Sequence, residues 1–248
     1  MTERLGARDA ALLLAVALLW AANFVISKIG LASFPPLLFS VLRFAMLAAL
    51  IPFVAPPAAP WRVTAGLGLT LGLFTFLLTF LALAVGLGAG LASVILPSQV
   101  FFTVIAAAVL FRERVEPIQM AGLVLGAAGL VWLALARVDG FSPLGFLICL
   151  GAAMGQAVAN FIQRAARGAD ALSMVVWMSL APIAPLLALS FAFEGGPAIL
   201  SSLASAGAGA WLAVAYTAFG STALAYAIWG AMLAKLPAAR VAPFALLV

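Results

Sequence analysis

The apolar residues of this chain are gathered into runs of about twenty, each closed by charged residues, glycine or proline. A run of this length is what an α-helix needs to cross the hydrocarbon core of a bilayer. The runs are continuous and do not alternate with period two, which favours helices over the strands of a membrane β-barrel. The predicted spanning segments are Ala10–Ile29, Pro36–Val54, Val63–Leu83, Gly90–Phe111, Ile118–Ala136, Leu144–Gln163, Ala171–Phe193, Gly207–Leu233 and a ninth run that starts near Ala238.

The composition places the chain in a lipid bilayer and excludes several classes of function. Hydrophobic residues make up 67% of the chain and charged residues 8%, against roughly 45–50% and about 25% in soluble domains. The net charge of +5 does not indicate a nucleic-acid partner, because the twelve Lys and Arg are spread over loops. The chain has no histidine and a single cysteine, Cys149. Histidine-based metal sites, Ser-His triads and an internal disulfide are therefore excluded, and we expect no metal and no cofactor.

The basic residues are distributed unequally over the two sides of the predicted bundle. One side, formed by the N-terminus and the even-to-odd loops, carries nine Lys and Arg, whereas the opposite loops carry Lys28 and Arg137. Because cytoplasmic loops are enriched in Lys and Arg, we predict a multi-pass protein of a bacterial inner membrane with a cytoplasmic N-terminus. The nine residues are Arg4, Arg8, Arg62, Arg112, Arg114, Arg164, Arg167, Lys235 and Arg240.

A short sequence recurs in the first and sixth segments, as Ala22-Asn23-Phe24 and Ala159-Asn160-Phe161. Five segments precede the polar break at residues 137–142, and an odd number inverts the second half relative to the first, as in transporters built from inverted repeats. We predict an all-α integral membrane fold of two five-helix repeats, at residues 1–139 and 140–248. The ninth run reaches Val248 after eleven residues, so we expect the second repeat to stop in its fourth helix and a tenth helix to lie beyond it.

The residues around the first asparagine resemble a known family. The stretch LWAANFVISK at residues 19–28, followed by Pro35 and Arg43-Phe44, and the run ARVAPF at residues 239–244 are similar to the EamA family of the drug/metabolite transporter superfamily. The likeness covers the whole chain, and within the family the YddG-type amino-acid exporters are the most similar in style. The resemblance implies a ten-helix carrier that exports a small molecule, an amino acid or related metabolite.

Amide side chains inside apolar helices mark the predicted substrate site. Trp20 and Asn23 share one face of the first segment at a spacing of three residues, and Gln156 and Asn160 share one face of the sixth at a spacing of four. A buried amide costs free energy unless it finds a hydrogen-bond partner, so these faces should point into the bundle or a wet cavity. Alternatively, the amides hold neighbouring helices together.

Proline and aromatic residues extend this site. Pro97 removes a backbone donor from the fourth segment and frees a carbonyl near Gln99. Either this carbonyl binds a substrate, or the proline only kinks the helix. Pro182 bends the seventh segment in the same way. The predicted substrate-binding residues are Trp20, Asn23, Gln99, Gln156, Asn160, Trp177 and Tyr226, and the predicted gating or kink residues are Pro97 and Pro182.

Three further patterns concern helix ends and helix packing. Arg43 lies inside the second segment. Its side chain is expected to do one of three things: extend to the membrane surface, pair with an interior partner, or bind a substrate carboxylate. Four tryptophans toward segment ends are predicted to be interface anchors: Trp61, Trp132, Trp211 and Trp229. Glycine pairs with small-x-x-x-small spacing allow close helix approach: Gly68/Gly72, Gly122/Gly126 and Gly151/Gly155.

The positions of the acidic residues bear on the mechanism. All seven fall in loops or at segment ends, so the carboxylates that usually relay protons inside a membrane are missing from the segments. No Walker motif is present. We predict facilitated diffusion by alternating access without proton coupling, and no enzymatic activity. The alternatives are an exporter of drug-like organic cations or a non-transporting structural membrane protein. The acidic residues are Glu3, Asp9, Glu113, Glu116, Asp139, Asp170 and Glu194.

Overall fold

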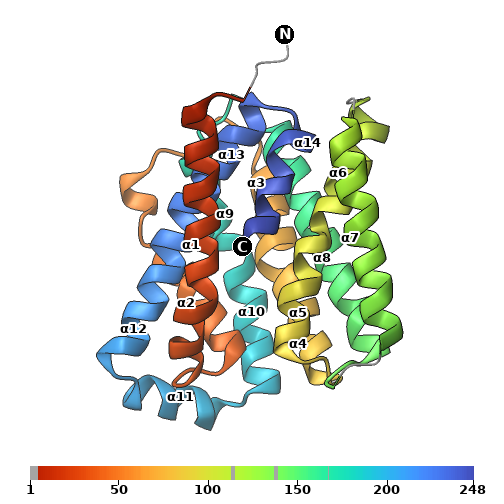
Figure 1. Ribbon diagram of the computed structural model, residues 1–248. Helices are drawn as coiled ribbons and strands as arrows, with labels where there is room; N and C mark the ends of the chain where they lie inside the picture. The colour runs from red at the N-terminus through yellow and green to blue at the C-terminus, as the bar shows by residue number, and fades with distance from the viewer. Residues whose placement is uncertain (1–4, 113–114, 137–138, 167) are drawn as a thin grey trace.

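The computed structural model describes residues 5–112, 115–136, 139–166 and 168–248 of the chain (Figure 1). Helices and their connections make up these ranges, and no strand occurs in them. The α-helices are α1 (Ala7–Leu31), α2 (Pro36–Ala48), α3 (Trp61–Leu67), α4 (Thr75–Ala84), α5 (Ala89–Ile95), α6 (Gln99–Phe111), α7 (Pro117–Ala136), α8 (Pro143–Ala165), α9 (Ala171–Met178), α10 (Leu180–Phe193), α11 (Gly196–Ser205), α12 (Ala208–Ala215), α13 (Ala225–Lys235) and α14 (Ala238–Val241). The 3₁₀ or π-helical segments are η1 (Ile51–Phe53), η2 (Gly68–Phe74), η3 (Leu96–Ser98), η4 (Tyr216–Leu224) and η5 (Ala242–Leu247). The charged residues that lie outside the described ranges are Glu3, Arg4, Glu113, Arg114, Arg137 and Arg167.

Eight helical segments in the described part of the chain are long and apolar enough to cross a membrane, and a shorter apolar helix, Ala238–Leu247, follows them. These segments coincide with the predicted runs to within a few residues, which confirms the all-α membrane fold. We number them as the first to the eighth span: Ala7–Leu31, Pro36–Phe53, Trp61–Leu83, Gly90–Leu110, Pro117–Ala136, Pro143–Gln163, Ala171–Phe193 and Ala208–Lys235.

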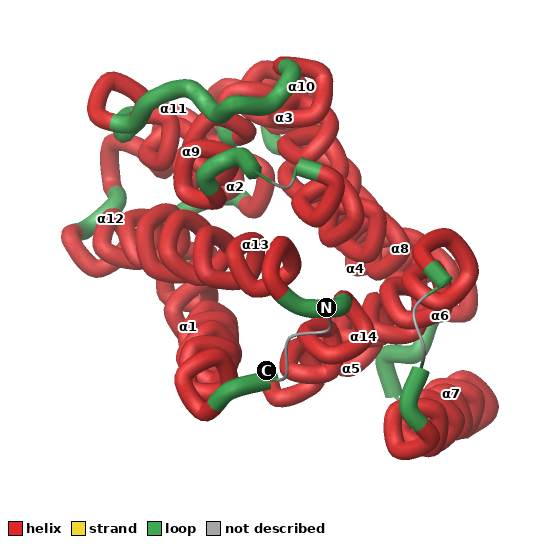
Figure 2. The backbone as a smooth tube through the Cα atoms, turned by 90° about the horizontal axis from the view of Figure 1, so that it is seen from above, coloured by secondary structure: helices red, strands yellow, loops and turns green. Residues whose placement is uncertain are grey.

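Consecutive spans run in opposite directions. The N-terminus and the turn between α13 and α14 lie at one end of the bundle, and α11 lies across the other end (Figure 1). We call these ends the N-terminal side and the opposite side. Seen from above, α7 lies at the periphery (Figure 2), and none of its described residues is buried. The helix α11 is a feature that the apolar runs did not predict, because at ten residues it is too short to span a bilayer.

Several spans are discontinuous. In the fourth span, Pro97 lies in the 3₁₀ turn η3 that separates α5 from α6. In the seventh span, α9 ends at Met178 and α10 begins at Leu180. The break has a covalent cause, since Pro182 has no N–H to donate to the carbonyl of Met178, four residues earlier.

A π-helical turn occurs in both the third and the eighth span. In η2 and the residue that follows it, the Thr75 hydroxyl donates to the carbonyl of Thr70 at 2.9 Å, and around η4 the Thr222 hydroxyl donates to that of Thr217 at 2.7 Å. Each bond joins residues five positions apart. The third and eighth spans occupy equivalent places in the two predicted repeats, so this recurrence supports the prediction of a duplicated chain.

Glycine lets the third and seventh spans approach closely. A Cβ atom on Gly68 would collide with the carbonyl oxygen of Met178, and one on Gly72 would lie 2.7 Å from a ring carbon of Pro182. Gly126 and Gly155 are similarly covered by aromatic rings, whereas a Cβ on Gly122 would meet open space. The packing interpretation of the glycine pairs is therefore confirmed at Gly68 and Gly72 and is wrong at Gly122.

The tryptophans predicted to be interface anchors do not form one class. Trp61 and Trp132 are 54% and 68% exposed on the protein surface, as anchors require. Trp211 packs edge-on against Phe34, with ring centroids 5.2 Å apart. Trp229 is 1% exposed, so its prediction as an anchor is wrong: its indole finds a partner inside the bundle.

Glu194 joins the seventh span to the second at the opposite side. Its carboxylate accepts hydrogen bonds from the backbone N–H groups of Leu37 and Leu38, and from the hydroxyl of Ser190 at 2.6 Å. The first turn of α2 has N–H groups without partners inside the helix, and a carboxylate placed there also interacts favourably with the helix dipole. The carboxylate therefore caps α2 from outside its own span.

Replacing Glu194 by alanine is expected to destabilise the fold by about 2–3 kcal/mol, because three bonds to a carboxylate are lost and two N–H groups lose their acceptor. Thermal unfolding in detergent, followed by tryptophan fluorescence, measures the effect. Ser201→Ala is the control, since Ser201 is exposed on the neighbouring helix α11 and its hydroxyl donates to the carbonyl of Ala198 within the same helix. Equal melting temperatures for the two variants would show that the cap does not stabilise α2.

Candidate functional site

A cavity of about 360 Å³ lies inside the bundle, within the size range of small-molecule sites. Residues of both predicted repeats line it, from the first four spans, the sixth and eighth spans, and η5. Its polar lining consists of Trp20, Asn23, Ser27, Ser40, Arg43, Thr75, Thr79, Gln99, Gln156, Ser221 and Tyr226. Its apolar lining consists of Leu31, Pro36, Leu37, Phe39, Phe76, Leu83, Leu96, Pro97, Ala245 and Val248.

Arg43 supplies the charge of this lining. It lies seven residues into α2, about 10 Å from the start of the helix at the usual rise per residue, and it is 7% exposed. Its Nε donates to the hydroxyl of Thr222 at 2.7 Å, and its Nη2 lies 3.5 Å from the Ser221 hydroxyl. The guanidinium carbon lies 5.3 Å from the ring centroid of Phe76, within range of a cation–π interaction. Arg43 thus has interior partners and does not reach the membrane surface.

The π-helical turn η4 orients Arg43 and Trp20. The Thr222 hydroxyl donates its proton to the carbonyl of Thr217, which leaves a lone pair for Arg43. The backbone carbonyl of the neighbouring residue, Ser221, accepts from the indole Nε1 of Trp20 at 3.1 Å. Single π-helical turns frequently mark functional sites, and here one turn supplies partners to two residues of the lining.

An aromatic cluster closes the inner end of the cavity. The Trp20 ring lies 5.0 Å, centroid to centroid, from both Tyr226 and Trp229. Behind it, toward the N-terminal side, buried residues of the first, fourth and eighth spans and α14 form a continuous apolar core, including Leu13, Val104 and Leu233. No residue of the first span that precedes Trp20 belongs to the described lining. The cluster therefore separates the cavity from the N-terminal side.

The amide side chains that line the cavity differ in whether they have hydrogen-bond partners. The Gln156 amide donates to the Tyr226 hydroxyl at 3.3 Å. The Oδ1 atom of Asn23 is buried and has no hydrogen-bond partner among the described residues. Because a buried acceptor without a donor costs free energy, Asn23 offers a position at which a bound molecule can place an N–H or O–H group.

Asn160 lies behind the wall of the cavity. Its amide nitrogen donates to Gln99 Oε1 and to the Thr103 hydroxyl, both at 3.3 Å, and its Oδ1 accepts from the Trp229 indole at 3.0 Å. Asn160 is 2% exposed and does not line the cavity. It positions Gln99, which does, and Trp229 is the interior partner that the sequence-based placement at the interface missed.

Two predicted site residues lie apart from the cavity. The Trp177 indole donates to the carbonyl of Val54 at 3.0 Å and packs in a second apolar cluster with Leu50 and Met178. Pro182 contacts the third span at Gly72. The structure therefore brings together Trp20, Asn23, Gln99, Gln156, Tyr226 and Pro97, places Asn160 directly behind them, and separates Trp177 and Pro182 from them.

Ser221, Thr222 and Phe76 are site residues that the sequence reasoning missed. None of them is unusual in an apolar helix: Ser and Thr hydroxyls there commonly bond their own backbone, and a phenylalanine is one more apolar side chain. A signal was nevertheless present. The pair Thr70 and Thr75 has the same five-residue spacing as the pair Thr217 and Thr222, and the latter pair lies beside Arg43.

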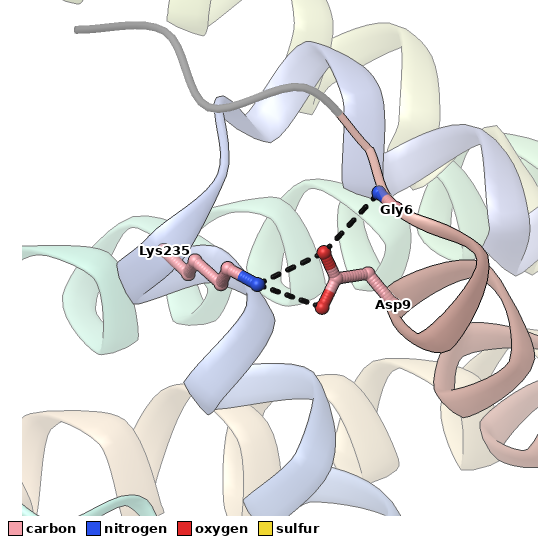
Figure 3. Close-up of polar contacts among 3 residues, drawn as sticks. All are labelled: Gly6, Asp9 and Lys235. Atoms are coloured by element: carbon pink, nitrogen blue, oxygen red, sulfur yellow. Dashed lines mark hydrogen bonds and ion pairs between the residues drawn. The ribbon is translucent and has the colours of Figure 1, made fainter.

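Polar contacts join the two predicted repeats at the N-terminal side. Asp9, at the start of α1, accepts two bonds of 2.9 Å from the Lys235 ammonium at the end of α13, and one of 3.3 Å from the N–H of Gly6 (Figure 3). Nearby, Arg240 lies 3.3 Å from Glu116. The Asp9 side chain is 8% exposed and that of Lys235 is 42% exposed, so protein covers the carboxylate while the ammonium stays partly exposed.

The cavity extends toward the opposite side. Its lining includes the last residue of α1, Leu31, the first residue of α2, Pro36, and Leu83 near the end of α4. All three lie at the end of the bundle away from the N-terminus. The cavity therefore continues to the opposite side, and the aromatic cluster ends it toward the N-terminal side.

An all-helical, multi-pass bundle with a polar cavity inside its membrane-spanning segments is the architecture of a membrane transporter of the helical class. Residues 9–135 match the EamA-like transporter family, and the chain belongs to this family. It is 39% identical to a protein of Salmonella typhimurium and 36% identical to one of Escherichia coli K12, each described as a probable amino-acid metabolite efflux pump. Each alignment covers 97% of this chain and 83% of the relative. A crystal structure of a further protein has the same fold, with a TM-score of 0.73 and 23% identity over 97% of this chain and 85% of that one.

Proposed function

We propose that the protein exports amino acids or related small metabolites across a bacterial inner membrane. The observation that carries this proposal is a cavity of small-molecule size that is closed at one side of the bundle and extends to the other. The two relatives described as probable amino-acid metabolite efflux pumps support the choice of substrate. Trp20, Asn23, Gln99, Gln156 and Tyr226 are the residues of the cavity that contact the substrate, and Asn160 acts through Gln99.

The mechanism we propose is alternating access. The N-terminal side carries the described basic residues Arg8, Arg62, Arg112, Lys235 and Arg240, and we assign it to the cytoplasm by the positive-inside rule. The structure then corresponds to a state closed to the cytoplasm. A rearrangement that separates Asp9 from Lys235 and opens the aromatic cluster would expose the same cavity to the cytoplasm.

Transport without proton coupling is consistent with the chemistry of the cavity wall. Arg43 is the charged side chain of its described lining, and a guanidinium stays protonated throughout the physiological pH range. It therefore does not cycle a proton. A positive wall also disfavours the alternative substrate class, organic cations, through like-charge repulsion.

Purified protein in liposomes loaded with a panel of radiolabelled amino acids tests the proposal. We expect efflux down the gradient that is unchanged by a protonophore, and an efflux rate about tenfold lower for Trp20→Ala, which loses the ring contacts and the bond to Ser221. Trp132→Ala is the matched control, because Trp132 is exposed on peripheral α7. Efflux no faster than from protein-free liposomes would refute the export function, and equal rates for the two variants would refute the cavity as its route.

A further inference from the structure

We propose that Arg43 binds the carboxylate of the transported molecule and makes that carboxylate, not the ammonium, the group a substrate must carry. This inference rests on the proposed function, because it specifies the substrate class of the same cavity. It is carried by the charge balance of the cavity wall, by the geometry of the guanidinium and by the unsatisfied acceptor at Asn23.

No carboxylate in the described part of the chain forms an ion pair with Arg43. A charged side chain inside a membrane protein is costly unless it is paired or faces a wet cavity, and such residues mark substrate pathways. An anionic group of a substrate would supply the missing charge. The described carboxylates are placed elsewhere, and none of them is paired with Arg43: Asp9 binds Lys235, Glu194 caps α2, Glu116 lies beside Arg240, Asp170 caps α9, and Asp139 lies in the turn before α8.

The guanidinium is held in one orientation with donors to spare. Nε bonds Thr222 and Nη2 lies near Ser221, whereas a guanidinium has five N–H donors in all. Phe76 lies against the group and limits its rotation. The planar fork of an arginine matches the two oxygens of a carboxylate, so an anchored guanidinium on the cavity wall is suited to this ligand.

The rest of the wall completes the match without adding a negative charge. Asn23 Oδ1, which lacks a donor among the described residues, can accept from an amino or a hydroxyl group equally well. Phe39, Leu83 and Leu96 offer an apolar surface for a side chain. The structure therefore fits a small monocarboxylate that has a hydrogen-bond donor near the carboxylate and an apolar tail, whether that donor is charged or neutral.

Competition with four analogues of one shape tests the inference on the wild-type protein. The reporter is efflux of any amino acid that moves in the liposome assay. The competitors are leucine, its 2-hydroxy acid, its amide and its decarboxylated amine. We expect leucine and the hydroxy acid to inhibit at similar concentrations, and the amide and the amine to need at least tenfold more. Equal inhibition by the amine and the acid, or no inhibition by any of the four, would overturn the inference while export itself stands.

Variants of Arg43 give a second, independent readout. Arg43→Gln should lower efflux at least tenfold and abolish the preference for leucine over its amide, and Arg43→Lys should retain part of that preference. Arg62→Gln, which removes an exposed arginine of the N-terminal side, is the control and should behave as wild type. Size-exclusion chromatography verifies that each variant is folded. A folded Arg43→Gln protein that still prefers leucine over its amide would overturn the inference.

Discussion

Replacing Gly68 by alanine is expected to destabilise the fold severely, although the change adds a single methyl group. The added Cβ would collide with the backbone carbonyl oxygen of Met178, and a backbone atom cannot turn aside as a flexible side chain can. Inserting a methyl group into a well-packed interior costs about 1–3 kcal/mol, and occasionally more. Because Gly68 begins the π-helical segment η2 and Met178 ends α9, the third and seventh spans would have to separate.

Thermal unfolding in detergent measures this effect, and we expect the melting temperature of Gly68→Ala to fall by about 5–10 °C, or the protein to fail to accumulate. Gly122→Ala is the matched control: it adds the same methyl group to a spanning helix at a place with nothing within 4 Å of the new atom. Alanine favours helix more than glycine does by about 1 kcal/mol, so this variant should be at least as stable as wild type. Identical melting curves for the two variants would refute the close approach of the third and seventh spans.

Replacing Asp9 by asparagine is expected to open the cavity to the N-terminal side. The substitution removes the ion pair that joins α1 to α13 (Figure 3). Because the Lys235 side chain is 42% exposed, solvent screens the pair, and we expect its loss to shift the equilibrium between the closed and open states severalfold. The readout is labelling of Thr79→Cys, in the cavity wall, by a membrane-impermeant maleimide applied from either side. The buried native thiol is first removed by Cys149→Ala.

We expect labelling from the N-terminal side to become severalfold faster in Asp9→Asn, and the exchanged pair Asp9→Lys with Lys235→Asp to restore the wild-type rate. Glu116→Gln is the control, because the Glu116 side chain is 53% exposed whereas that of Asp9 is 8% exposed, and pairs with an exposed carboxylate contribute little. If both single variants leave the labelling rate unchanged, the Asp9–Lys235 pair does not hold this side closed.

The sequence predicted the spans and their alternation well, because both follow from the length of apolar runs and the placement of basic residues. The boundaries of segments such as Ala171–Phe193 agree with the structure. The interruption at Pro97 was also predictable, since proline lacks an N–H. The π-helical turn at Tyr216–Leu224 was not, because it contains no proline, and its extra residue per turn has no signature in the apolar pattern.

The cavity was predicted in part. Asn23 and Gln156 were predicted to line the cavity because an amide without a hydrogen-bond partner costs free energy in hydrocarbon. A wet cavity and a neighbouring side chain supply such a partner equally well. Asn160 shows the difficulty: three protein partners satisfy it, and its sequence context is the same as that of Asn23. Trp177 and Trp229 were assigned by their depth along a helix. Which way an indole points is decided by rotation about the helix axis, which depends on packing against other spans.

The Glu194 cap bears on which parts of the bundle move together. It fastens the second span to the seventh, and Gly72 holds the third span against Pro182 in the same group. The first and fourth spans share an apolar core with the eighth span and α14. A rocking motion that preserves these contacts must therefore divide the bundle across both repeats. The two repeats that the sequence predicts and the bodies that hinge in the membrane would then be different partitions of the same chain.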